Sequence, residues 1–174
     1  LFRSTFFKDC SKLKEVDLSF IYDPYLNDLT ETFMNCINLI SVKLPQKLYG
    51  IEHMTSTFEN CRNLEYVDLS ELEGDEDLLD MDKMFKNCHK LKNVTFPRIE
   101  AEQLISANSI FYNCYELKAI NMGDFLTDII TNMNYMFYYC KSLEYLDLSK
   151  IKTKHLQNIN NIFTEVNKAI TLFI

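Results

Sequence analysis

Six cysteines recur along the chain at almost constant spacing. They are separated by 26, 25, 27, 26 and 26 residues, and they are Cys10, Cys36, Cys61, Cys88, Cys114 and Cys140. Thiols at regular spacing could form disulfides, hold a metal ion or act as nucleophiles. No C-x-x-C pair is present, however, and Val166 occupies the next equivalent position. The position therefore favours a small buried apolar group, and we expect a column of free thiols, with disulfides and a metal site as weaker alternatives.

The histidines and acidic residues do not complete a catalytic or metal-binding motif. His53, His89 and His155 share no repeat position, and no G-x-S-x-G, H-E-x-x-H or glycine-rich phosphate loop occurs. The acidic stretch between Glu71 and Asp80 does not have the spacing of an EF-hand loop and is interpreted as a solvated connection. We therefore predict no catalytic residue, no cofactor site and no metal site.

Composition excludes further classes of protein. The 174 residues fit one domain, and 47% hydrophobic residues supply a core. A net charge of −7 argues against general nucleic-acid binding, which requires a basic surface. No apolar run reaches the length of a membrane-spanning helix, so direct membrane insertion is not expected.

Phenylalanine and aliphatic residues follow the same period as the cysteines. A phenylalanine stands three residues before each of the seven equivalent positions, and a leucine stands three residues after the first six. Valine, isoleucine or leucine follows three residues further on, so each copy reads F-x-x-C-x-x-L-x-x-V-x-L. The phenylalanines are Phe7, Phe33, Phe58, Phe85, Phe111, Phe137 and Phe163. Copies in a fixed register predict a tandem array with a core of stacked columns.

Each repeat is expected to hold one strand and one helix. The V-x-L end alternates apolar and polar residues, as a half-buried strand does. Upstream of each phenylalanine the apolar residues have helical spacing, as in Leu156, Ile159, Ile162 and Phe163. An asparagine precedes the cysteine in four copies, at Asn35, Asn60, Asn87 and Asn113, and suits the left-handed end of a helix. Met54, Met81, Met133 and Met136 are expected inside. One strand and one helix in such a period are typical of a leucine-rich-repeat solenoid.

The sequence also resembles the BspA-like subtype of leucine-rich repeats, whose signature runs N-M-x-x-M-F-x-x-C-x-x-L-x-x-L-D-L-S-x-F-x-T. The segment from Asn132 to Thr153 fits it nearly throughout, and D-L-S recurs at Asp17–Ser19 and Asp68–Ser70. The pattern departs at Leu44-Pro45, Phe96-Pro97 and Met122-Gly123. The resemblance implies an α/β fold over residues 1–174: a single solenoid of six to seven repeats of 25–27 residues, with a parallel sheet on the concave face and helical segments on the convex face.

Residues that flank the inward valines are expected to point outward from the strands and to meet a partner. These candidate partner-binding residues are Glu15, Asp17, Lys43, Tyr66, Asp68, Asn93, Thr95, Asn121, Tyr145 and Asp147. Tyrosine is favoured at interfaces, so Tyr66 and Tyr145 are the expected anchors, and the aspartates would add charge selectivity. The pairs Tyr112/Tyr115 and Tyr138/Tyr139 form a second candidate surface.

We therefore expect a non-catalytic protein-interaction module without cofactors. The resemblance implies a cell-surface or secreted, adhesin-like protein that engages a host or matrix protein. The alternative is an intracellular scaffold or a subunit of a large cytoplasmic or cytoskeletal assembly. No polar capping repeat is visible. We therefore expect the chain to be part of a longer array, or its ends to contact neighbouring chains.

Overall fold

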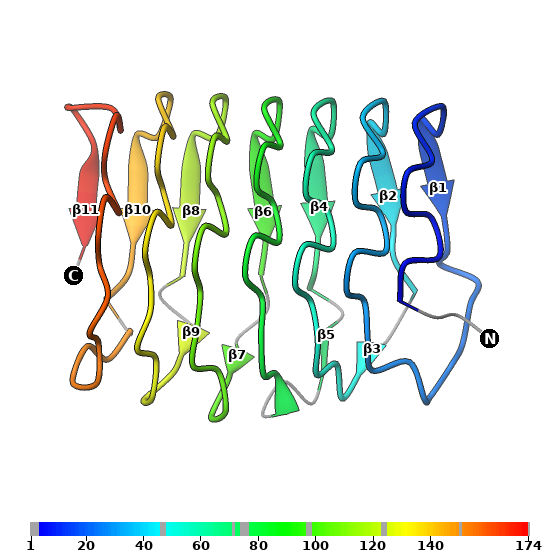
Figure 1. The fold of residues 1–174 in the computed structure, drawn as a ribbon, viewed down its shortest axis with the longest axis horizontal. Coiled ribbons are helices and arrows are strands. Elements are labelled where there is room, and N and C mark those ends of the chain that lie inside the picture. Colours follow the sequence, from blue (N-terminus) through cyan, green and yellow to red (C-terminus); the bar gives the residue numbers. More distant parts are fainter. Residues whose placement is uncertain are drawn as a thin grey trace.

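The chain forms a parallel β-solenoid, seen here in a computed structural model that describes residues 4–45, 48–70, 72–73, 77–96, 99–122, 125–149 and 151–173. One parallel sheet has the order β1-β2-β4-β6, and a second has the order β8-β10-β11 (Figure 1). The strands are β1 (Glu15–Asp17), β2 (Ser41–Lys43), β4 (Tyr66–Asp68), β6 (Asn93–Thr95), β8 (Ala119–Asn121), β10 (Tyr145–Asp147) and β11 (Thr171–Phe173). The fold is a parallel β-solenoid of about five turns, so the predicted count of six to seven repeats is not supported.

Shorter elements connect successive repeats away from these sheets. Strand β3 (Leu48–Tyr49) pairs with β5 (Leu72–Glu73), and β7 (Ile99–Glu100) pairs with β9 (Phe125–Leu126), both in parallel. A line of isolated parallel bridges joins Asp28, His53, Asp80, Ser106, Asn132 and Asn158. Each repeat is therefore hydrogen-bonded to its neighbours at several points around the solenoid.

The predicted helices are wrong: turns occupy the segments around the phenylalanines, and the described residues contain no α-helix. A helix directs backbone N–H groups back along the same segment, to the fourth residue before. Here the phenylalanine N–H groups cross to the next repeat instead. Phe33 donates to the carbonyl of Thr57, Phe58 to that of Met84 and Phe85 to that of Ile110, each with N···O of 2.9 Å.

Left-handed residues allow this crossing. Positive φ occurs two residues before and two residues after each repeat phenylalanine, at fourteen positions that are not glycine. Asn35, Asn60, Asn87 and Asn113 are among them, with φ of 62–65°. The left-handed conformation expected for these asparagines is confirmed, although no helix ends there. Asparagine tolerates this conformation better than most residues, which lets a chain with three glycines turn so often.

The asparagines also form a ladder along the solenoid. The side-chain amide of Asn35 donates to Asp9 at 2.7 Å, and each following amide donates to the Oδ1 of the asparagine before it. The Nδ2···Oδ1 distances are 2.7 Å from Asn60 to Asn35, 2.8 Å from Asn87 to Asn60 and 2.8 Å from Asn113 to Asn87. The ladder therefore binds five successive repeats through side chains alone.

Phenylalanine rings stack through the core as the period predicts. Phe33, Phe58, Phe85, Phe111 and Phe137 are fully buried. Successive rings from Phe7 to Phe137 lie 5.3–5.6 Å apart, centroid to centroid, with interplanar angles of 1–9°. The four methionines expected inside are buried as well. Apolar side chains of the last repeat are less covered, and Phe163 is 40% exposed.

Five of the six cysteines lie in this core as free thiols, but Cys10 is exposed, so the prediction of a fully buried column is wrong at its first member. The buried thiols, starting at Cys36, donate to the phenylalanine carbonyl of the preceding repeat with S···O of 3.0–3.1 Å. Burial raises the pKa of Cys36 to about 11 and also raises the pKa of the other four thiols well above its ordinary value. These thiols therefore stay protonated and serve as hydrogen-bond donors.

Candidate functional site

The outward side chains of the seven parallel strands form the strand face, which we define by the residues on either side of each strand's central residue. The central residues Val42, Val67, Val94, Ile120 and Leu146 are buried, whereas their neighbours are exposed or half-buried. The ten candidate partner-binding residues all lie on this face. The four-stranded sheet carries seven of them, namely Glu15, Asp17, Lys43, Tyr66, Asp68, Asn93 and Thr95. The three-stranded sheet carries Asn121, Tyr145 and Asp147.

Parallel register brings these residues into rows. In the first row Glu15 lies beside Ser41, Ser41 beside Tyr66 and Tyr66 beside Asn93. The second row pairs Asp17 with Lys43 and Asp68 with Thr95 in one sheet, and Asn121 with Asp147 in the other. The structure therefore gathers the predicted residues of each sheet into one surface, as the period requires.

Several side chains of the strand face form ion pairs or hydrogen bonds with one another. The Lys43 ammonium lies 3.0 Å from the Asp17 carboxylate, and the Tyr66 hydroxyl lies 3.0 Å from the Thr95 hydroxyl. Tyr66 is nevertheless 45% exposed and Tyr145 is 36% exposed. Their rings thus offer contact area to a partner, and the Tyr66–Thr95 hydrogen bond restrains the ring of Tyr66.

The aspartates of the D-L-S segments have a structural role in addition. Oδ1 of Asp17, Asp68 and Asp147 accepts a hydrogen bond from the backbone N–H two residues later, at 3.0, 3.0 and 2.9 Å. Such Asx turns end the strand and direct the chain away from the sheet. Hydrogen bonds from Ser19, together with the one from Lys43, lower the pKa of Asp17 to about 2. The Asp17 carboxylate is therefore ionised across the physiological range and keeps its ion pair with Lys43.

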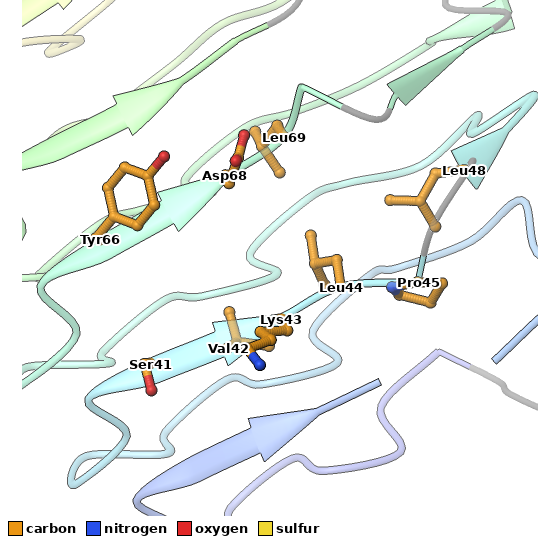
Figure 2. A pocket seen from close by; sticks show the side chains of 9 residues that line it. All are labelled: Ser41, Val42, Lys43, Leu44, Pro45, Leu48, Tyr66, Asp68 and Leu69. Atoms are coloured by element: carbon orange, nitrogen blue, oxygen red, sulfur yellow. The ribbon is translucent and has the colours of Figure 1, made fainter. Parts of the chain in front are cut away.

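An apolar hollow of about 400 Å³ opens at the carboxyl ends of β2 and β4 (Figure 2). Strand-face residues Lys43, Tyr66 and Asp68 line one part of it. The remainder is lined mainly by apolar residues at and after the strands, namely Val42, Leu44, Pro45, Leu48 and Leu69. Sequence reasoning missed this hollow. Its one signal was the Leu44-Pro45 pair, which places an apolar residue where the three D-L-S repeats have a serine.

The His53–Asp80 pair is the closest arrangement to a catalytic dyad. Nδ1 of His53 lies 2.6 Å from Oδ2 of Asp80, and this hydrogen bond raises the pKa of His53. The neighbouring hydroxyl, that of Thr55, donates to Asp80 rather than to the imidazole. In a catalytic triad the hydroxyl bonds to the histidine, so this geometry does not activate a nucleophile. The pair instead joins two adjacent repeats.

The described residues hold neither a metal-binding cluster nor a membrane-spanning helix. Within the described ranges, no group of three histidine, cysteine, aspartate or glutamate side chains is arranged to hold a metal ion. No helix in the described part of the chain is long and apolar enough to cross a bilayer. In the acidic stretch between Glu71 and Asp80, residues 71 and 74–76 lie outside the described residues, so its interpretation as a solvated connection stays a prediction.

Comparison with known proteins finds one matching family and a similar solved structure. The family described as "Mycoplasma protein of unknown function, DUF285" matches residues 4–121 and again residues 52–172. A crystal structure of a leucine-rich repeat protein from Bacteroides ovatus aligns with a TM-score of 0.41 and 20% sequence identity. That alignment covers 86% of this chain and 44% of the Bacteroides protein, so the chain spans less than half of that protein's length. Comparison with curated proteins finds no match.

Proposed function

The chain belongs to the DUF285 family of Mycoplasma proteins of unknown function, and on that premise we propose that it is a non-catalytic protein-interaction module whose strand face binds a partner protein. The single observation that carries this proposal is the strand face itself. Parallel rows of exposed polar and aromatic side chains stand on a core that fixes their backbone. Repeat folds of this kind use such extended surfaces to bind other macromolecules.

The mechanism is binding by a surface that is ordered before the partner arrives. Stacked rings and inter-repeat hydrogen bonds hold the strands, so little conformational entropy is lost on association. Tyr66 and Tyr145 supply aromatic contact area. Asp17, Asp68 and Asp147 supply negative charge, and the hollow beside Lys43 and Tyr66 accepts one apolar side chain of the partner. The polar rim of the interface is formed by the remaining candidates, Glu15, Asn93, Thr95 and Asn121.

The cellular location of the protein is part of the same proposal. A cell-surface or extracellular protein that engages a host or matrix protein is the leading form, and it rests on the signature matched by residues 132–153. The second form is a scaffold within a cytoplasmic or cytoskeletal assembly. Antibody labelling of intact source cells separates the two. Labelling without permeabilisation is expected for the first form, and labelling only after permeabilisation would assign the second.

A matched pair of tyrosine variants tests the strand face. Wild-type protein is passed over immobilised host and matrix proteins, and affinity is measured for each one bound. The double variant Tyr66→Ala/Tyr145→Ala is expected to bind at least about tenfold more weakly, since aromatic anchors dominate interface energies. Tyr22→Ala/Tyr25→Ala removes two tyrosines that are 72% and 87% exposed outside the strand face, and it should bind as wild type does. Equal losses in the two double variants would refute the strand-face site.

A further inference from the structure

Five tyrosines gather on a second surface, in the turns around the phenylalanines rather than on the strands. We call Tyr112, Tyr115, Tyr135, Tyr138 and Tyr139 the tyrosine patch. The rings of Tyr112 and Tyr138 stack at 4.7 Å with an interplanar angle of 11°. Tyr135 meets both rings edge-on, at 6.3 and 5.7 Å, and Tyr139 lies 4.7 Å from Tyr138. The Lys141 ammonium connects Tyr115 to this group, since it lies 6.0 Å from the ring centroid of Tyr115 and also lies over Tyr139.

Two cations share one repeat position with Tyr115 of the patch, Lys141 one repeat after it and Arg62 two repeats before it. The position directly after the cysteine holds Arg62, His89, Tyr115 and Lys141 in four successive repeats. The His89 ring stacks on Tyr115 at 4.7 Å, and the Lys141 ammonium lies 4.8 Å from the ring centroid of Tyr139.

Arg62 and Lys141 differ from the neighbouring Lys86 in having no ion pair among the described residues. Nζ of Lys86 lies 5.9 Å from the Tyr112 ring but is paired with Glu59 at 3.1 Å. Arg62 and Lys141, in contrast, are exposed and have no ion-pair partner within the described residues. Two cations without ion pairs in the described part of the chain thus share this repeat position, and the carboxylate of Glu165, in the next repeat, acts electrostatically on Tyr138.

Ring stacking covers one face of several rings and leaves the hydroxyl groups and the cations available. Tyr112 and Tyr138 cover one face of each other, His89 covers one face of Tyr115, and Lys141 lies over Tyr139. None of the five hydroxyls is hydrogen-bonded to another described residue, and hydroxyl and guanidinium donors both suit carboxylate acceptors.

From this arrangement we infer that the tyrosine patch binds a short acidic segment of a partner protein. Carboxylates of the segment pair with Arg62 and Lys141 and accept hydrogen bonds from the tyrosine hydroxyls of the patch. A long polyanion such as a nucleic acid would meet too few cations here and would be repelled by the acidic remainder of the protein. This second site does not depend on the strand-face function. The tyrosine patch would prefer an acidic partner segment, whereas the aspartates of the strand face would prefer a basic one.

The test uses a fluorescent oligoglutamate peptide and an otherwise identical oligoglutamine peptide, with anisotropy as the readout. Oligoglutamate should bind more tightly than oligoglutamine, and its binding should weaken as salt is raised. The charge reversal Arg62→Glu/Lys141→Glu should reduce oligoglutamate affinity at least about tenfold. Tyr112→Phe/Tyr138→Phe keeps the stacked rings and removes two donors, so affinity should fall about fivefold.

A matched control separates the patch from net charge. Lys12→Glu/Lys154→Glu makes the same charge change at two exposed lysines outside the patch, and it should lose less than half as much affinity. Equal losses in the two charge-reversed proteins would overturn the inference. So would failure of oligoglutamate to bind more tightly than oligoglutamine, or tighter binding of heparin or oligothymidylate. Circular dichroism of each variant confirms that it has folded.

Discussion

Replacing Phe85 by alanine is expected to lower the free energy of unfolding by about 3–5 kcal/mol, as large truncations in protein cores do. Phe85 is fully buried, and its ring stacks on Phe58 at 5.4 Å and on Phe111 at 5.6 Å. Removing the ring leaves a void between two parallel rings that the stacked backbone prevents from closing. Urea unfolding followed by circular dichroism measures the loss.

Phe163 is the matched control because it has the same repeat position but a different environment. Its ring is 40% exposed and stacks on Phe137 alone within the described residues, at 6.1 Å. Phe163→Ala should therefore lower the free energy of unfolding by less than half as much as Phe85→Ala does. Similar losses at the two positions would mean that the rings do not form one buried column.

Replacing Asn60 by alanine is expected to lower the free energy of unfolding by about 2–4 kcal/mol. This loss combines the strain of an alanine in the left-handed conformation with the loss of two side-chain hydrogen bonds. Asn60 has φ of 65°. Its amide donates to Asn35 at 2.7 Å, and its Oδ1 accepts from Asn87 at 2.8 Å. The substitution therefore introduces backbone strain and interrupts the asparagine ladder at its centre. The measurement is again urea unfolding.

Asn60→Gly separates the two causes, since glycine adopts positive φ without steric cost. The glycine variant loses only the ladder and should be more stable than the alanine variant by about 1–2 kcal/mol. Equal stability of the alanine and glycine variants would refute the backbone contribution. A glycine variant as stable as wild type would show that the ladder contributes nothing.

The sequence predicted the columns and the outward face because both follow from the period alone. Once the spacing places Val67 and Val94 at equivalent positions, stacking fixes their direction, and their neighbours Tyr66 and Asp68 must face the other way. The left-handed asparagines were also predictable, since few residues other than glycine tolerate that conformation.

The helices were predicted wrongly because apolar residues three apart have two physical origins. Helical turns produce this spacing, and so do successive tight turns whose N–H groups bond to the next repeat. Hydrophobic periodicity does not separate them. The left-handed position two residues before each repeat phenylalanine has no common residue type, since it holds Ser56, Lys83 and Tyr135 among others. It therefore left no sequence signal that could have excluded a helix.

The tyrosine patch and the hollow were only partly visible in the sequence. Both depend on contacts between repeats whose surface residues differ, so they follow no period. Tyr135 belongs to the patch because it meets Tyr112 from a neighbouring repeat, and Leu48 lines the hollow from a separate short strand. Positions that break the repeat pattern were the one available signal for such sites.

Thiol labelling of the native protein tests the central claim most directly, namely that the repeat side chains stack in buried columns and leave only the outward surfaces for partners. Cys10 is exposed and the other five thiols are buried with raised pKa values. One thiol per molecule should react promptly with a thiol-specific reagent, and none should in Cys10→Ser, with the other five reacting only after denaturation. Prompt reaction of several thiols in the native protein would contradict the account.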